Sequence, residues 1–333
     1  MPVQLRQLVP GTGTAVPAKA HSSLIHYFGI SIATVSPAMP TRAPRRPPVP
    51  SLRSPSELQG RFAELEELSK ARALAVAISD FETDRDFSYH GDRWFHAAST
   101  IKLAVLVGVY GAIHRGELLP QSRVHVRNRF LSAYDGSPYR VRVDRDANAE
   151  VHREIGRTLR VSELADHMIT SSSNLATNLL LDLVGLDVLQ RTLDQFELEG
   201  IDLRRGVEDE LAYQHGISNR VTARGLVGLL RLIEEERAFS PELSRQMLDV
   251  LHRQQFRSGI PAGLPREARV ANKTGDISTV AHDAGLVYLP NRKPYAIAVL
   301  TEWEPSATGR STTIAAASYI GYAALVGDRA DDD

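Results

Sequence analysis

The stretch STIKLAVLVGVYGAI at residues 99–113 is apolar on every side of an α-helix. No face of such a helix suits water, so it is predicted to be buried in the middle of the protein. Strand patterns stand on both sides of it along the chain. They are expected at 73–80 and near 87–90 before it, and at 268–274, 283–289 and 296–301 after it, with a final helix at 312–326.

Helical patterns fill the stretch from 161 to about 250, between the two groups of strands. Together they predict an α+β fold, in which an antiparallel sheet built from both chain ends is flanked by helices and carries an inserted all-helical region. The folded domain is expected at 56–327, with an α/β part at 56–98 and 260–327 and a helical part at 99–259. The cleft between sheet and helical region is the natural place for a site.

Both chain ends differ in composition from this domain. Residues 1–55 are predicted to be a disordered or linker tail, because 38–50 is rich in proline and arginine, and 328–333 form an acidic tail. Residues 22–38 are mildly apolar and are interpreted either as a degraded signal-peptide core or as part of the tail. No run of 18 uninterrupted apolar residues occurs, so a membrane span is not expected.

Composition excludes several kinds of function. A formal net charge of −1 gives no reason to expect nucleic acid or an acidic membrane surface as a partner. The absence of cysteine excludes disulfides, thiolate zinc sites and a cysteine nucleophile. Only five of the 39 Lys and Arg residues are lysines, so a lysine is favoured where an amine must give up its proton.

The first candidate motif is Ser99-Thr100-Ile101-Lys102. It places serine and lysine on one face of the first turn of the buried helix. The N–H groups at the helix start face a developing oxyanion, and a buried amine beside the hydroxyl can accept its proton. A serine that only caps the helix is the alternative.

Two further motifs follow along the chain. Ser172-Ser173-Asn174 precedes a helix and is read either as a polar site or as a helix cap. Lys273-Thr274-Gly275 stands at a strand end. In the functional interpretation, the lysine and the threonine offer a cation and a hydroxyl to a substrate carboxylate, and the glycine lets substrate approach the backbone. In the alternative, the motif is simply a strand end that turns at glycine.

The order Ser-x-x-Lys, Ser-x-Asn and Lys-Thr-Gly resembles class A β-lactamases and penicillin-binding proteins. The resemblance covers roughly 56–327 and extends to the runs MITSSSNLATNLLL and NKTGDISTVAHDAGLVY. It implies a serine hydrolase that opens β-lactam rings through an acyl-enzyme on Ser99, with no metal or organic cofactor. It also implies a β-lactam or peptide-like substrate, a monomer, and a periplasmic or secreted location.

The resemblance implies roles for the remaining residues. Catalytic work is assigned to Lys102, Ser172, Glu208 and Lys273, with Lys102, or Glu208 through a water, taking the proton of Ser99. Substrate binding is assigned to Asn174, Thr274, Gly275, Asp276 and His282, and the backbone N–H groups of Ser99 and Asp276 are the oxyanion donors.

Glu208 lies in VEDELA, 36 residues after Ser172, where the family carries the glutamate that activates the deacylating water. A solvated acidic turn is the alternative, and Glu210 aligns with a second acidic position of this loop. Three departures from the family pattern put fast deacylation in doubt. Ser173 replaces an aspartate, Ala212 replaces an asparagine that holds the water, and Arg204 or Arg205 faces only Asn219 where an arginine–aspartate tie is expected.

Other readings stay open. An extra segment at 128–148 is expected to shape one wall of the cleft. His282 is interpreted as lining the cleft beside Lys273, or as structural. No histidine pair has metal-ligand spacing, which argues against a metallohydrolase. A penicillin-binding DD-peptidase or an esterase is the nearest rival, and a non-catalytic binding module is a weaker one.

Overall fold

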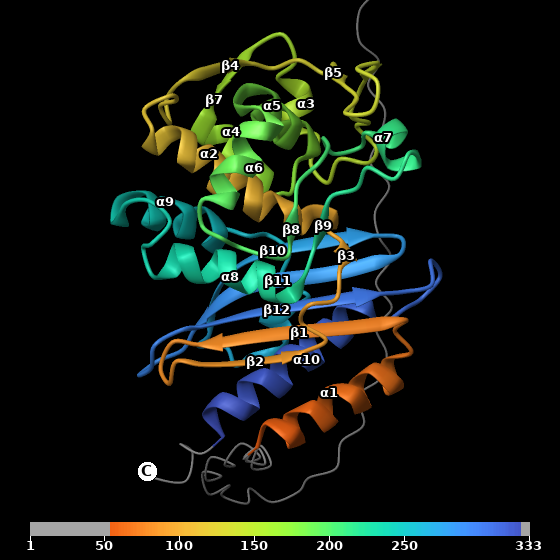
Figure 1. Ribbon diagram of the computed structural model, residues 1–333, viewed down its shortest axis with the longest axis vertical. Coiled ribbons are helices and arrows are strands. Elements are labelled where there is room, and N and C mark those ends of the chain that lie inside the picture. The colour runs from red at the N-terminus through yellow and green to blue at the C-terminus, as the bar shows by residue number, and fades with distance from the viewer. Residues whose placement is uncertain (1–53, 328–333) are drawn as a thin grey trace, which may run out of the picture. The chain divides into compact units, whose positions relative to one another are not determined.

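Five antiparallel strands form the sheet on which the fold is built (Figure 1), in a computed structural model that describes residues 54–327. Their order is β10-β11-β12-β1-β2. They span Ala73–Asp80 (β1), Arg85–Tyr89 (β2), Arg269–Ile277 (β10), Val280–Tyr288 (β11) and Tyr295–Glu302 (β12). Because β1 pairs with β12, the sheet joins the two ends of the domain, which confirms the predicted α+β class. The predicted tails at 1–55 and 328–333 lie outside the described residues, except for positions 54 and 55.

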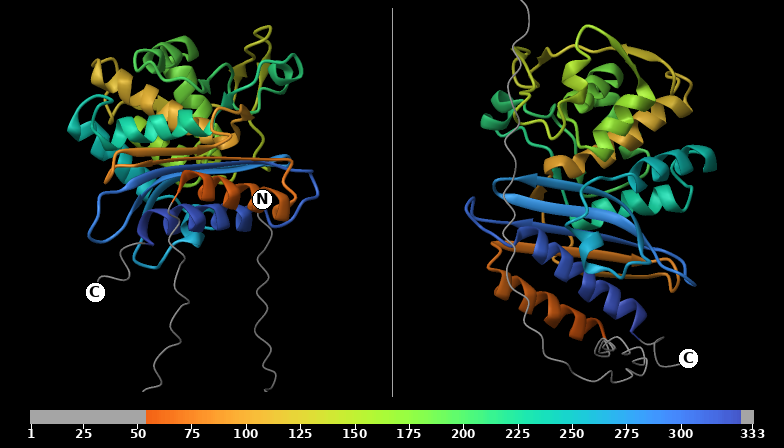
Figure 2. Two further views of the ribbon diagram at one scale, coloured as in Figure 1. Left: turned by 60° about the horizontal axis from the view of Figure 1, so that its bottom comes forward. Right: turned by 180° about the vertical axis from the view of Figure 1, so that it is seen from behind.

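Alternating side chains of β1 enter two separate cores. Leu74, Val76 and Ile78 pack under α1 (Pro55–Ser69) and α10 (Arg310–Val326). The intervening alanines of β1 face the opposite side, where α8 (Ala223–Glu234) lies on the sheet. Figure 2 shows α1 and α10 side by side on one face, with the helical region on the other. Cover on both faces explains why β1 and β12 are almost continuously apolar in the sequence.

Helix α1 begins at a capping serine followed by proline. The Ser54 hydroxyl accepts a hydrogen bond from the Glu57 backbone N–H at 3.2 Å, and Pro55 occupies the first turn. The helix ends at Lys70, whose φ of 59° lies in the left-handed region. A capping serine followed by proline is a common helix start because neither residue loses an internal hydrogen bond there.

The helical region surrounds α2 (Lys102–His114), whose residues 102–112 are all buried. The structure differs from the expected continuous helix at its start, because the turn Ala98–Ile101 is a 3₁₀ helix, η1, that leads into α2. The other longer helices are α4 (Val161–Thr170), α5 (Asn174–Val184), α6 (Leu186–Asp194) and α9 (Pro241–His252). Short elements complete the fold: β3 (Phe95–His96), β4 (Arg123–His125), β5 (Phe130–Leu131), β6 (Pro138–Tyr139), α3 (Glu150–Arg153), β7 (Thr158–Arg160), β8 (Ile201–Asp202), α7 (Glu210–Gln214), β9 (Arg220–Val221) and η2 (Ile260–Gly263).

The extra segment 128–148 contains the β5–β6 hairpin and reaches two parts of the helical region. The Asn178 side chain of α5 donates to the hydroxyl of Tyr139 at 3.2 Å. Ser132 donates to the carboxylate of Asp209, at the start of α7, at 2.8 Å. The segment therefore bridges α5 and the loop before α7. Within residues 54–327, no helix is long and apolar enough to cross a membrane.

Candidate active site

The first and third motifs meet because Gly275 has no side chain. A Cβ at this position of β10 would lie 3.1 Å from the Ser99 backbone nitrogen and 3.0 Å from that of Thr100. Such contacts are tighter than most real Cβ atoms make, so glycine favours the close approach of the strand to the helix start. As a result, the backbone of η1 lies directly against the Lys273-Thr274-Gly275 strand.

Lys102 is fully buried, and its amine contacts the second motif. Its Nζ lies 2.6 Å from the Ser172 carbonyl oxygen, 3.2 Å from Ser172 Oγ and 2.8 Å from Asn174 Oδ1. Burial lowers the pKa of Lys102 to about 7, while the negative charges of Asp146 and Glu208 act in the opposite direction. The amine can therefore exist both neutral and charged near neutral pH.

Ser172 is shared by two buried lysines. Its hydroxyl lies 3.0 Å from Lys273 Nζ, which also donates to the Thr274 carbonyl oxygen at 2.8 Å. Burial, and then the charge of Lys102, hold the pKa of Lys273 well below its usual range. Ser172 has a φ of 59°, a conformation that is costly for a residue with a side chain and that clusters at functional sites.

Glu208 is held by two donors, one on each carboxylate oxygen. Asn174 Nδ2 donates to Oε1 at 2.8 Å, and the Arg142 backbone N–H donates to Oε2 at 3.0 Å. Glu208 also has a positive φ, 62°. Because Asn174 accepts from Lys102 and donates to Glu208, its amide links the two groups that the sequence proposes as bases.

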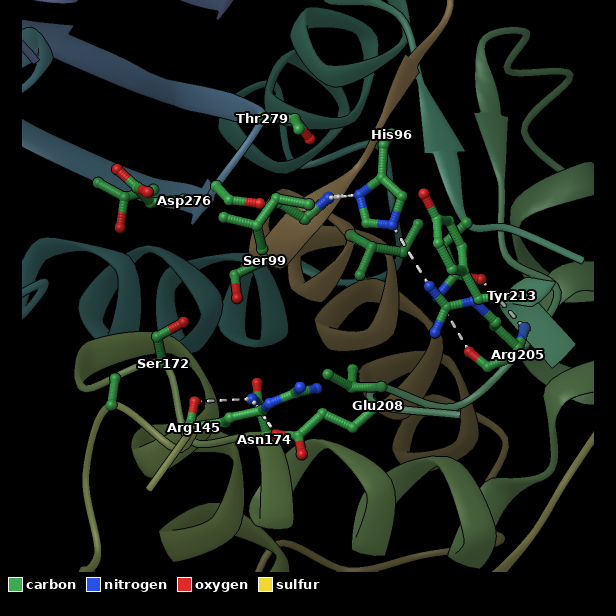
Figure 3. Close-up of a pocket in the computed structure, with 18 of the residues that line it drawn as sticks. His96, Ser99, Arg145, Ser172, Asn174, Arg205, Glu208, Tyr213, Asp276 and Thr279 are labelled. Atoms are coloured by element: carbon green, nitrogen blue, oxygen red, sulfur yellow. Dashed lines mark hydrogen bonds between the residues drawn. The ribbon is translucent and has the colours of Figure 1, made fainter. Parts of the chain in front are cut away.

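A cavity of about 750 Å³ opens over these residues. Figure 3 shows the side chains of Ser99, Ser172, Asn174 and Glu208 around one space. Among hydrogen bonds within residues 54–327, none involves the Ser99 hydroxyl, so it remains available to a ligand. The predicted site residues that line the cavity are Ser99, Ser172, Asn174, Glu208, Thr274 and Asp276, whereas Lys102, Lys273 and Gly275 lie behind this lining.

Other lining residues were not singled out from the sequence. They include His96, Arg145, Tyr213, Phe256 and Thr279. Position next to a motif would have indicated His96, three residues before Ser99, and Thr279, four residues after Gly275. The rest come from segments without a motif and are brought to the cavity by the fold.

His282 does not line the cavity, which corrects the expectation drawn from the sequence. Its ring is 2% exposed and lies in β11 opposite Gly275. Nε2 lies 2.9 Å from the His96 carbonyl oxygen, and Nδ1 accepts from the Thr301 backbone N–H at 3.1 Å. Both ring nitrogens serve the backbone, so His282 is structural. Burial lowers its pKa to about 4, which keeps it neutral.

The loop that carries Glu208 is tied at its neck through Asn219. The Asn219 side chain accepts from the backbone N–H groups of Arg204 and Arg205 at 2.8 and 3.0 Å and donates to the Arg205 carbonyl at 2.9 Å. An amide thus replaces the expected ionic tie. Ala212 is fully buried in α7 and does not line the cavity.

Fold and site together are those of a serine hydrolase, with the buried amine of Lys102 in contact with the second motif. Comparison with known proteins agrees: a sequence model of the β-lactamase enzyme family matches residues 57–325, and the chain belongs to this family. A β-lactamase of Bacillus licheniformis is 30% identical over 259 residues, covering 74% of this chain and 76% of that protein. A β-lactamase of Streptomyces fradiae is 31% identical over 282 residues, covering 80% and 85%.

Solved structures show the same relationship. A variant of the last common ancestor of Gram-negative class A β-lactamases superposes with a TM-score of 0.71 at 28% identity, covering 82% of this chain and 99% of that one. An acyl-enzyme complex of a PBP-A mutant with penicillin G superposes with a TM-score of 0.67 at 27% identity, covering 84% and 99%.

Proposed function

We propose that this protein hydrolyses β-lactams through an acyl-enzyme on Ser99. The observation that carries the proposal is the linked set Lys102–Asn174–Glu208 beside a free serine hydroxyl. One set of hydrogen bonds links the group that we propose as the base for acylation to the group that we propose as the base for deacylation.

In acylation, the Ser99 proton is accepted by neutral Lys102, or by Glu208 through a water. Ser99 Oγ then forms a bond to the lactam carbonyl carbon, and the backbone N–H groups of Ser99 and Asp276 stabilise the oxyanion. When the C–N bond breaks, Ser172 Oγ gives its proton to the leaving nitrogen. The neighbouring lysine amines return a proton to Ser172, at 3.0 and 3.2 Å.

In deacylation, Glu208 takes a proton from a water that attacks the ester carbon. The ester bond to Ser99 Oγ breaks, Ser99 regains a proton, and the ring-opened acid leaves. We propose that this step is slow, because Ala212 offers no amide to hold the water. Losing one positioning hydrogen bond costs on the order of 1–3 kcal/mol, or roughly one to two decades in rate.

Substrate binding falls to the second and third motifs. The Asn174 amide orients the substrate amide, and Thr274 with Lys273 receives the carboxylate. We propose a monomer as the working form. Sedimentation of the purified protein tests that state, and a dimer at micromolar concentration would contradict it.

Mass spectrometry after exposure to penicillin tests the proposal. The adduct is expected on Ser99, and Ser99→Ala should abolish it. Glu208→Gln should leave acylation in place and make the adduct persist. Labelling of Ser172 instead of Ser99 would refute the mechanism.

The second candidate is a penicillin-binding peptidase or esterase on the same fold, and the similarity to PBP-A favours it. It predicts a burst with nitrocefin followed by a long-lived adduct already in the unmodified protein. An adduct lifetime that Glu208→Gln leaves unchanged would make this candidate the better one.

A further inference from the structure

The second motif holds Ser173 where its family carries an aspartate, yet a carboxylate occupies that part of the fold. It belongs to Asp146, 27 residues earlier, in the extra segment 128–148. The Asp146 side chain is fully buried. It accepts from the backbone N–H groups of Asn174 and Leu175 at 2.8 and 3.1 Å and from Ser173 Oγ at 3.1 Å.

These contacts fall on the start of α5, where backbone N–H groups have no partner within the helix. A carboxylate there satisfies them and interacts favourably with the helix dipole. Ser172, just before this helix, has a positive φ that its surroundings must maintain. Asp146 therefore holds Ser173 and the backbone that follows it, next to Ser172 and including Asn174.

The charge of Asp146 also reaches the amine of Lys102 and raises the pKa of Lys102 against the effect of burial. The charged groups around this amine are Asp146 from the extra segment, Glu208 from its loop and Lys273 from β10. Asp146 itself faces His152, whose Nε2 lies 3.1 Å away.

We propose that Asp146 is a positioning residue of the active site and takes the place of the missing motif carboxylate. The proposal rests on the function proposed above. Asp146 acts through Ser172, Asn174 and Lys102, without touching the substrate.

The same segment also holds the glutamate of the loop. The Arg142 backbone N–H binds Glu208, and the buried Asp209 accepts from Ser132 Oγ at 2.8 Å and from the Ala133 N–H at 2.7 Å. The segment 128–148 thus positions both the second motif and the carboxylate of Glu208. Removing the segment would therefore disturb the two half-reactions together.

The test uses four full-length proteins: unmodified, Asp146→Asn, Ser173→Asp and the double variant. Asp146→Asn keeps the shape but turns one acceptor into a donor that faces backbone N–H groups. Acylation by nitrocefin should fall about tenfold or more, and its acid limb should move to lower pH because Lys102 loses a stabilising negative charge. Asp144→Asn is the matched control, since Asp144 is exposed and pairs with Arg142. It should leave the rate unchanged.

The double variant supplies the decisive comparison. Ser173→Asp alone should slow acylation, because Ser173 Oγ lies 3.1 Å from the Asp146 carboxylate and two carboxylates would meet there. Combined with Asp146→Asn, the same change should restore acylation and return the acid limb toward its original pH. A purely structural role for Asp146 predicts no shift of the acid limb, and an unshifted acid limb in folded variants would overturn the proposal.

Urea unfolding of the same four proteins separates this proposal from the proposed function. If the unmodified protein is not acylated, the β-lactamase function fails. If Asp146 occupies the motif site, Ser173→Asp must still lower the free energy of unfolding of the unmodified protein and raise that of Asp146→Asn. Should Asp146→Asn alone fail to fold, the double variant decides. A soluble, acylated double variant supports the proposal, and a folded but inactive one, or one that also fails to fold, refutes it.

Discussion

The acylation rate should depend on the fraction of Lys102 that is unprotonated. The pKa of Lys102 is lowered to about 7 by burial. Roughly one tenth of the amine is then neutral at pH 6 and roughly nine tenths at pH 8. Since only the neutral amine accepts the Ser99 proton, the acylation rate should rise about tenfold between these two pH values.

The assay is stopped-flow acylation by nitrocefin under single-turnover conditions, from pH 5 to 9. It should be run on the unmodified protein and on Glu208→Gln, in which the adduct accumulates and acylation is isolated. Removing the carboxylate of Glu208 also removes a charge that raises the pKa of Lys102. The acid limb of Glu208→Gln should therefore lie at lower pH than that of the unmodified protein.

Two results would refute this reasoning. An acylation rate that is flat from pH 6 to 8 would mean that Lys102 does not accept the proton. Loss of acylation in Glu208→Gln would assign that step to Glu208 acting through a water.

Three further predictions concern the frame of the site. Asn219→Ala removes three hydrogen bonds at the base of the Glu208 loop and should lower the free energy of unfolding in urea by about 3 kcal/mol. It should accelerate neither acylation nor deacylation. An unchanged free energy of unfolding would show that these hydrogen bonds do not hold the loop. Gly275→Ala places a Cβ 3.1 Å from the Ser99 nitrogen, so acylation should fall at least about tenfold in a folded protein, and normal acylation would show that strand and helix can separate freely. For His282, the folded pKa of about 4 lies below the unfolded value near 6.5, so its contribution to stability is present above pH 6.5 and lost as pH falls toward 4, by about 3 kcal/mol. His282→Gln should flatten that part of the pH–stability curve, and an unchanged curve would assign acid lability to other groups.

Much of the fold was predictable because strands and buried helices leave simple patterns. The predicted strand 73–80 coincides with β1, whose alternate residues face two cores. The scarcity of lysine was informative as well. Lys102 and Lys273 are fully buried at Ser172, while Lys70 and Lys293 are exposed. Where charge alone suffices this chain mostly uses arginine, and two of its few lysines are the buried amines at Ser172.

Sequence alone could not give the orientation of side chains on adjacent residues. His282 follows the third motif closely, but strand alternation and the register opposite Gly275 turn its ring toward the backbone. Ala212 aligns with a position that holds water, yet it is fully buried in the first turn of α7. Ala212→Asn would force a polar side chain into a filled space, so it is a poorer probe of deacylation than Glu208→Gln.

Asp146 shows why a gap in a motif is not evidence that its chemistry is lost. What the start of α5 requires is a buried acceptor for the N–H groups of Asn174 and Leu175, and this requirement is spatial. Ser173 satisfies only part of it, because its hydroxyl accepts from Ala176 and donates to Asp146. A chain without the extra segment would leave these donors buried and unpaired, at a cost that favours either an aspartate at 173 or a carboxylate from elsewhere. The segment 128–148 and Ser173 therefore depend on each other, and neither substitution can be interpreted without the other.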